Sequence, residues 1–153
     1  MDRIAYRKLA MEGITTFFIL LFTYVAVRKM INSEDYLLQL GRFPFIAELA
    51  GIFIWLLPLI HISAALMLSV RRFRKIALNL TLILLLLYTI YIVAVLNFAD
   101  SVPCSCGAIH PALSWNEHLL FNITCMILAA LGIHLSNLSR NHGSYHYNTE
   151  IKT

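Results

Sequence analysis

The sequence predicts an all-α membrane protein built as a bundle of four transmembrane helices. Hydrophobic residues make up 59% of the 153 residues and charged residues 13%, whereas soluble globular domains have roughly 45–50% and about 25%. Each apolar run approaches or exceeds the roughly 20 residues that cross a bilayer as a helix, the form that satisfies the backbone within lipid. The four runs lie at about residues 9–27, 45–70, 76–99 and 119–138.

The chain is expected to form one domain over residues 1–138, with a loosely ordered, polar cytoplasmic tail at 139–153. Lys and Arg are more frequent in cytoplasmic loops, and this rule predicts that both termini are cytoplasmic. One side has nine of these residues: Arg3, Arg7, Lys8, Arg71, Arg72, Arg74, Lys75, Arg140 and Lys152. The other side has three: Arg28, Lys29 and Arg42. The chain is therefore predicted to be a multi-pass membrane protein, in the bacterial inner membrane if the source is Gram-negative. No basic stripe with interleaved aromatic residues indicates nucleic-acid binding.

The outer ends of the first two runs carry charges that need partners. Between the runs, Asn32 or Ser33 is expected to cap a short helix that has Glu34 and Asp35 in its first turn. Glu48 lies about one turn inside the second run. A charge at that depth is expected to face the bundle interior and pair with Arg28 or Lys29, the alternative being an interfacial carboxylate that reaches water.

Small and polar residues within the helices suggest packing roles. Ala47 and Gly51 have the small-xxx-small spacing that allows two helices to approach closely. His61 is expected to be a hydrogen-bonded packing residue, and Cys125 a small core residue. Tyr88 and Tyr91 are expected to pack or hydrogen-bond within the bundle, with an aromatic-lined quinone pocket as an alternative.

The fourth helix has a marked start. Ser114 is a helix cap with Glu117 three residues later, which is the capping-box spacing. Trp115 suits the membrane interface, and Asn122 follows one turn further in.

The segment from Ser101 to Pro111 holds the clearest chemical signal. Cys104 and Cys106 lie one residue apart, bracketed by prolines and followed by Gly107, which predicts a shaped loop. Facing outward, this loop lies in a compartment that permits disulfides. Two adjacent thiols can attack a partner disulfide and then resolve the mixed disulfide, and either cysteine can attack. His110 or His118, if protonated nearby, can stabilise a thiolate.

Two other hypotheses apply to the same segment. The cysteines can form a static disulfide or remain inert thiols. They can also bind a metal together with His110 and His118, but this spacing matches no standard zinc pattern, so no metal site is predicted.

Several short motifs resemble the methylamine-utilisation MauE family, within the DoxX-like four-helix membrane proteins. The resemblance rests on Cys104-Ser105-Cys106-Gly107, on Ser114-Trp115 and Asn122, and on the opening of the second helix at Pro44 and Glu48. Many relatives have Phe-Gly after the second cysteine, whereas here Gly107 follows directly. The resemblance implies redox-associated work with thioredoxin-like partners and catalytic roles for Cys104 and Cys106. The supporting residues are then Glu48, Arg28, Lys29, His110, His118, Trp115 and Asn122.

Together these observations predict a membrane thiol–disulfide redox protein, a thiol–disulfide oxidoreductase if it turns over. It would exchange electrons with an extracytoplasmic thioredoxin-like or disulfide-containing protein, and quinone is a candidate acceptor within the membrane. The alternative is a non-catalytic membrane subunit that binds and stabilises a partner protein or complex.

Overall fold

The computed structural model describes residues 2–41, 47–98 and 114–150. These residues form five α-helices and one short 3₁₀ helix. In chain order they are α1 (Asp2–Ile31), α2 (Ser33–Leu40), η1 (Ala47–Leu49), α3 (Ala50–Ser69), α4 (Arg74–Phe98) and α5 (Trp115–Glu150).

Four of the helices are long and apolar enough to cross a membrane, which confirms the predicted number of spans. By length and composition the spans are Ala5–Ile31, Ala47–Ser69, Arg74–Ala94 and Asn116–Leu138. Large apolar side chains such as Trp55, Leu59, Leu87 and Ile127 point away from the bundle and are more than half exposed. An exterior of this kind is suited to lipid.

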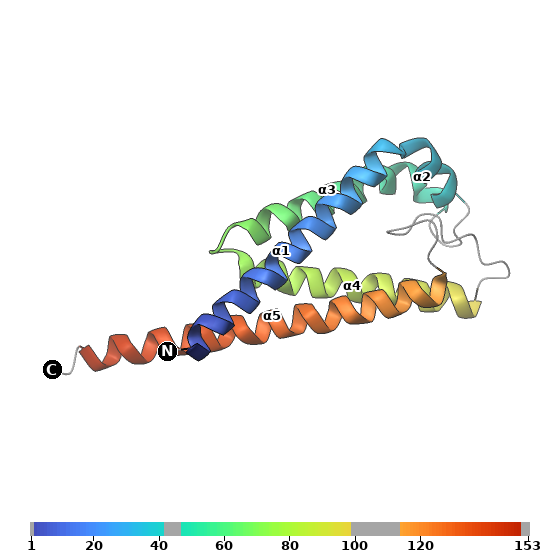
Figure 1. Ribbon diagram of the computed structural model, residues 1–153. Helices are drawn as coiled ribbons and strands as arrows, with labels where there is room; N and C mark the ends of the chain where they lie inside the picture. The colour runs from blue at the N-terminus through green and yellow to red at the C-terminus, as the bar shows by residue number, and fades with distance from the viewer. Residues whose placement is uncertain (1, 42–46, 99–113, 151–153) are drawn as a thin grey trace.

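The four spans form two pairs (Figure 1). Helix α1 packs on α3, and α4 packs on α5. The pairs lie close together near the N-terminus and diverge toward the other end, where α2 lies. The start of α1 and the last part of α5 lie at the same end of the bundle, whereas α4 ends and α5 begins at the α2 end. Both termini therefore lie at the end of the bundle away from the segment that joins α4 to α5.

The core between the pairs is made of large apolar side chains set against small ones. Its buried members are Phe18, Phe22, Ala64, Ala65, Leu68, Ala77, Leu78, Leu85, Cys125 and Ala129. Cys125 is 1% exposed, so the prediction of a small core residue is confirmed.

Of Gly13, Gly41, Gly51 and Gly132, the glycine with the closest neighbours is Gly132, not the glycine of the predicted small-residue pair. A Cβ at Gly132 would lie 3.3 Å from Ile14 on α1 and 3.3 Å from Leu78 on α4. By contrast, a Cβ at Gly51 would meet nothing within 4 Å, and Ala47 is exposed. The expected close packing at Ala47 and Gly51 is therefore wrong, because this face of the chain points outward.

The first and last membrane-spanning helices are longer than the apolar runs that predicted them. Helix α1 includes the polar residues on both sides of its apolar run, and α5 continues through 139–150, where we expected a loosely ordered tail. The sequence has no proline after Pro111, and a helix that is already nucleated gains one backbone hydrogen bond for each residue added.

The start of α5 confirms the predicted capping box. The Ser114 backbone N–H and hydroxyl both donate to Glu117 Oε2, at 2.7 and 3.0 Å, and the Glu117 N–H donates to Ser114 Oγ at 3.4 Å. The acidic first turn of α2, with Glu34 and Asp35, is confirmed as well.

Replacing Ser114 with alanine is expected to lower the free energy of unfolding by about 0.5–2 kcal/mol, the usual effect of losing an N-cap. Thermal unfolding in detergent micelles measures this. The matched control is Ser63→Ala, because the Ser63 hydroxyl is exposed and bonds only to the Leu59 carbonyl of its own helix. Equal losses for the two variants would contradict the capping role.

An ion pair joins the N-terminal half of α1 to the first residue of α4. Arg74 donates from both terminal nitrogens to the two carboxylate oxygens of Glu12, at 2.9 and 3.1 Å. The Arg74 side chain is 11% exposed and that of Glu12 48%. Arg71, which is largely exposed, lies 3.9 Å from the same carboxylate. The pair therefore places a buried guanidinium against a half-exposed acceptor.

Substituting Glu12 with glutamine is expected to destabilise the bundle by about 1–3 kcal/mol, because the buried Arg74 charge loses its carboxylate. The measurement is the shift of thermal unfolding in micelles. Glu34→Gln, an identical change at an exposed position of α2, serves as the control and should cause a smaller loss.

Candidate functional site

The two predicted catalytic residues belong to the segment that joins α4 to α5. Cys104, Cys106 and His110 lie outside the described residues. The helices on either side of this segment end and begin at the α2 end of the bundle (Figure 1). The described residues at this end are therefore the ones that bear on the predicted chemistry.

A polar and aromatic cluster lies at the α2 end, around Lys29. The Lys29 ammonium donates a hydrogen bond to the Tyr36 hydroxyl at 3.1 Å. It also lies 4.7 Å from the centre of the Tyr36 ring and 5.9 Å from the centre of the Tyr88 ring. Such cation–π contacts are worth about 0.5–2 kcal/mol or more, depending on how far the cation is desolvated. We call Lys29, Tyr36, His61 and Tyr88 the Lys29 cluster.

Local structure brings Lys29 and Tyr36 together. Helix α1 runs to Ile31 and α2 begins at Ser33, so the chain reverses over very few residues. Tyr36 is 6% exposed and packs with Leu40 and Ala50 in a small second core. The ring is thereby fixed against the end of α1, where Lys29 reaches it.

His61 forms the inner side of the cluster. Its Nδ1 is 2.5 Å from the Leu57 carbonyl oxygen. A carbonyl oxygen only accepts hydrogen bonds, so Nδ1 carries the proton, and in the neutral ring Nε2 is an acceptor. Nε2 faces the Tyr88 hydroxyl at 3.5 Å, and the two rings stack with centres 6.0 Å apart. His61 is 3% exposed, so the prediction of a hydrogen-bonded packing residue is confirmed.

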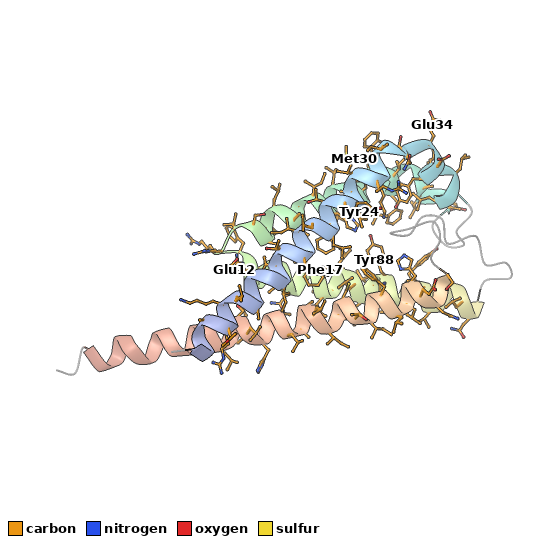
Figure 2. The ribbon with its side chains drawn as sticks, viewed as in Figure 1. Glu12, Phe17, Tyr24, Met30, Glu34 and Tyr88 are labelled. Carbon is orange, nitrogen blue, oxygen red and sulfur yellow. The ribbon has the colours of Figure 1, made fainter. Side chains whose placement is uncertain are left out.

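Tyr88 connects the two helix pairs. Figure 2 shows its side chain directed from α4 toward the α1–α3 pair. The contacts with His61 on α3 and with the Lys29 ammonium on α1 are both made by this residue. The cluster therefore spans the region where the pairs diverge.

The positive charge of Lys29 has no carboxylate partner among the described residues. Its hydrogen-bond acceptor is the Tyr36 hydroxyl, and burial raises the pKa of that hydroxyl above its ordinary value. Tyr36 is therefore a neutral phenol and does not neutralise the ammonium.

Two polar side chains on the same face of α5 have hydrogen-bonding atoms without partners in the described part of the chain. They are Nδ1 of His118 and Nδ2 of Asn122, both buried. Asn122 is 3% exposed and lies one helical turn beyond His118. The Thr89 hydroxyl on α4 is 3.6 Å from the Met126 sulfur on α5, so these two residues lie at the same level of the bundle. Asn122 lies one helical turn before Met126. It is therefore level with the α4 residues that follow Tyr88. Buried polar groups in proteins nearly always have hydrogen-bond partners, so these two unpartnered nitrogen atoms require an explanation.

The other predicted site residues that the structure describes are not members of the Lys29 cluster. Glu48 is exposed on η1, and the ion pairs among the described residues do not include it. The expected pairing of Glu48 with Arg28 or Lys29 is therefore not formed, because Arg28 is exposed and Lys29 is turned to the two tyrosines. Trp115 is the first residue of α5.

Three members of the cluster were not predicted as site residues: Tyr36, His61 and Tyr88. Tyr36 was given no role of its own, and His61 was expected to be a packing residue. Tyr88 was expected to pack or hydrogen-bond within the bundle, with an aromatic-lined quinone pocket as the alternative. The signal that could have found Tyr36 is its spacing of seven residues from Lys29 across a helix–helix turn. The sequence gives no such signal for His61 and Tyr88, which come from different helices.

Comparison with known proteins supports the resemblance seen in the motifs. The model of the family described as "Methylamine utilisation protein MauE" matches residues 7–135. Searches of the curated proteins and of the solved structures give no match. The matched residues contain the second and third membrane-spanning segments in full and nearly all of the first and fourth. Because the match covers most of the chain, the protein belongs to the MauE family.

Proposed function

We propose that this protein, a multi-pass membrane protein of methylamine utilisation, is a thiol–disulfide redox protein that works through Cys104 and Cys106. The observation that carries the proposal is the position of the cysteine pair in the sequence. The pair lies in the segment joining α4 to α5, and these helices end and begin at the bundle end opposite both termini (Figure 1). We also infer that the family lies within the DoxX-like group.

The exchange transfers a disulfide bond from one pair of sulfur atoms to another. A thiolate from the cysteine pair attacks the disulfide of an extracytoplasmic thioredoxin-like or other disulfide-containing protein, and one partner thiolate leaves. The second cysteine then attacks the mixed disulfide, which releases the other partner thiolate. Cys104 and Cys106 end as a disulfide and the partner as a dithiol. Either cysteine can attack, and the same steps run in reverse.

Orientation decides whether such a partner can reach the cysteines. We propose that both termini are cytoplasmic and that the cysteine pair faces outward from the bacterial inner membrane. The bias in Lys and Arg supports this orientation, as does the shared position of the termini at one end of the bundle.

The orientation predicts that an impermeant maleimide labels reduced Cys104 or Cys106 on intact spheroplasts. The chain for this test carries Cys125→Ser, so that only the pair can react; Cys125 is buried in the core. Labelling that requires disruption of the membrane would contradict the orientation.

The redox proposal is tested by alkylation that depends on redox state. Samples quenched with acid before and after brief reduction are alkylated with a heavy maleimide, and the gel shift counts free thiols. The proposal predicts both dithiol and disulfide forms of the pair in cells. A single invariant form, together with a partner complex that survives Cys104→Ser and Cys106→Ser, would identify the chain as a non-catalytic membrane subunit.

A further inference from the structure

We propose that the Lys29 cluster, together with Asn122, binds the head group of a membrane quinone, the acceptor for electrons that the cysteine pair releases. The role of this site in turnover rests on the thiol chemistry proposed above. The binding site itself is argued from the described residues alone. These come from all five α-helices: Lys29, Tyr36, His61, Tyr88 and Asn122.

The cluster has more hydrogen-bond donors than acceptors. An ammonium has three N–H donors, and the described contacts of Lys29 use one of them, to Tyr36. The amide nitrogen of Asn122 has two more, both unused within the described residues. The missing partner is therefore a hydrogen-bond acceptor. A molecule with two carbonyl oxygens can accept one hydrogen bond from Lys29 on α1 and another from Asn122 on α5.

The surroundings of these donors favour an apolar ring over a hydrated anion. Lys29, Tyr88 and Asn122 all lie within membrane-spanning segments. The Lys29 ammonium lies against the aromatic rings of Tyr36 and Tyr88, and stripping the water from an inorganic anion there is costly. A quinone presents a flat, apolar ring that can pack on aromatic side chains, and it carries two carbonyl oxygens.

The neighbouring residue shows that Lys29 is not simply an anchor for lipid phosphates. Arg28 and Lys29 are adjacent at the end of α1, yet Arg28 is exposed and Lys29 is partly buried toward the bundle. Arg28 is the residue placed to reach lipid head groups, as cationic side chains do near helix ends. The inward position of Lys29 points to an occupant of the bundle instead.

The charge of Lys29 suits the acceptor chemistry. When a dithiol becomes a disulfide it releases two electrons and two protons, and a quinone that takes up both becomes a quinol. Negative charge develops on the quinone oxygens during reduction. A fixed ammonium at those oxygens stabilises that charge, and its effect is large where water is excluded.

The test measures binding of decylubiquinone to the full chain in phosphatidylcholine nanodiscs, corrected for partition into empty nanodiscs. Saturable binding is expected, and Lys29→Met should weaken it about tenfold or more, as loss of a charge-assisted hydrogen bond does. Arg28→Met, the matched control, should leave affinity within about twofold. Absence of saturable binding, or equal affinities for Lys29→Met and Arg28→Met, would overturn the site.

Asn122→Leu separates binding from folding. The Asn122 amide nitrogen is unpartnered in the described residues, so an apolar side chain of similar size should preserve or raise the thermal stability of the protein. The same change should weaken decylubiquinone binding, because a donor is lost. Full retention of binding by this variant would remove Asn122 from the site, and full retention by both Asn122→Leu and Lys29→Met would overturn the proposal.

Two further arms separate the proposal from its alternatives. The Cys104→Ser/Cys106→Ser double variant should bind decylubiquinone like the unmodified chain, so binding stands even if the thiol chemistry fails. Nanodiscs with added phosphatidylglycerol should give the same affinity. Competition by phosphatidylglycerol that disappears in Lys29→Met would instead assign the ammonium to a lipid phosphate and contradict the quinone site.

Discussion

Cys104→Ser and Cys106→Ser are each expected to abolish thiol–disulfide exchange with a disulfide-containing partner. Both sulfur atoms are needed, because one attacks the partner and the other releases it. A hydroxyl forms no disulfide, so neither change can be compensated at the same position. The measurement is reduction or oxidation of a thioredoxin-like protein by the purified chain, followed by alkylation of that protein.

Cys125→Ser is the control for the loss of a thiol. Cys125 belongs to the same buried core as Phe18, Leu78 and Ala129 and is 1% exposed. The hydroxyl is more polar than the thiol, so some loss of thermal stability is expected, but exchange should continue. Full activity in both Cys104→Ser and Cys106→Ser would contradict the mechanism, as would loss of exchange in a folded Cys125→Ser protein.

Gly132→Leu is expected to disrupt the bundle itself. A Cβ at this position already comes within 3.3 Å of both Ile14 and Leu78, so a leucine side chain must displace residues of two other helices. Overpacking of a core costs about 1–3 kcal/mol and sometimes more. Thermal unfolding in micelles and the yield of folded protein both report the change.

Gly51→Leu is the matched control for this substitution. Gly51 also lies within a membrane-spanning helix, but a Cβ there meets nothing within 4 Å. The bundle should tolerate it, with unchanged or raised stability, since glycine is a poor helix former. Equal destabilisation by the two leucines would contradict the packing of α5 against α1 and α4.

The sequence predicted the features that depend on neighbouring residues. Hydropathy identified four spans because each span carries its own apolar run. The spacing of Ser114 and Glu117 identified the cap of α5 because both groups belong to one helical turn. The small second core around Tyr36 was missed because it forms only when α2 folds back on α3.

The sequence did not predict the contacts between distant residues. Glu12 and Arg74 are 62 positions apart, and nothing in their local sequence shows that these two residues meet. Glu48 was expected to pair with Arg28 or Lys29 because these residues lie at a similar depth in the membrane. In the structure the chain reversal between α1 and α2 places Tyr36 against Lys29. The Glu48 side chain is exposed at the surface.

The central claim is that Cys104 and Cys106 act as an attacking and a resolving thiol. Non-reducing gels of cells that express each single Cys→Ser variant, in the Cys125→Ser background, test it most directly. The account predicts that loss of the resolving cysteine leaves the other trapped in a mixed disulfide with a partner, a band that disappears on reduction and in the double variant. If neither variant traps a partner and both keep full activity, the exchange mechanism is wrong.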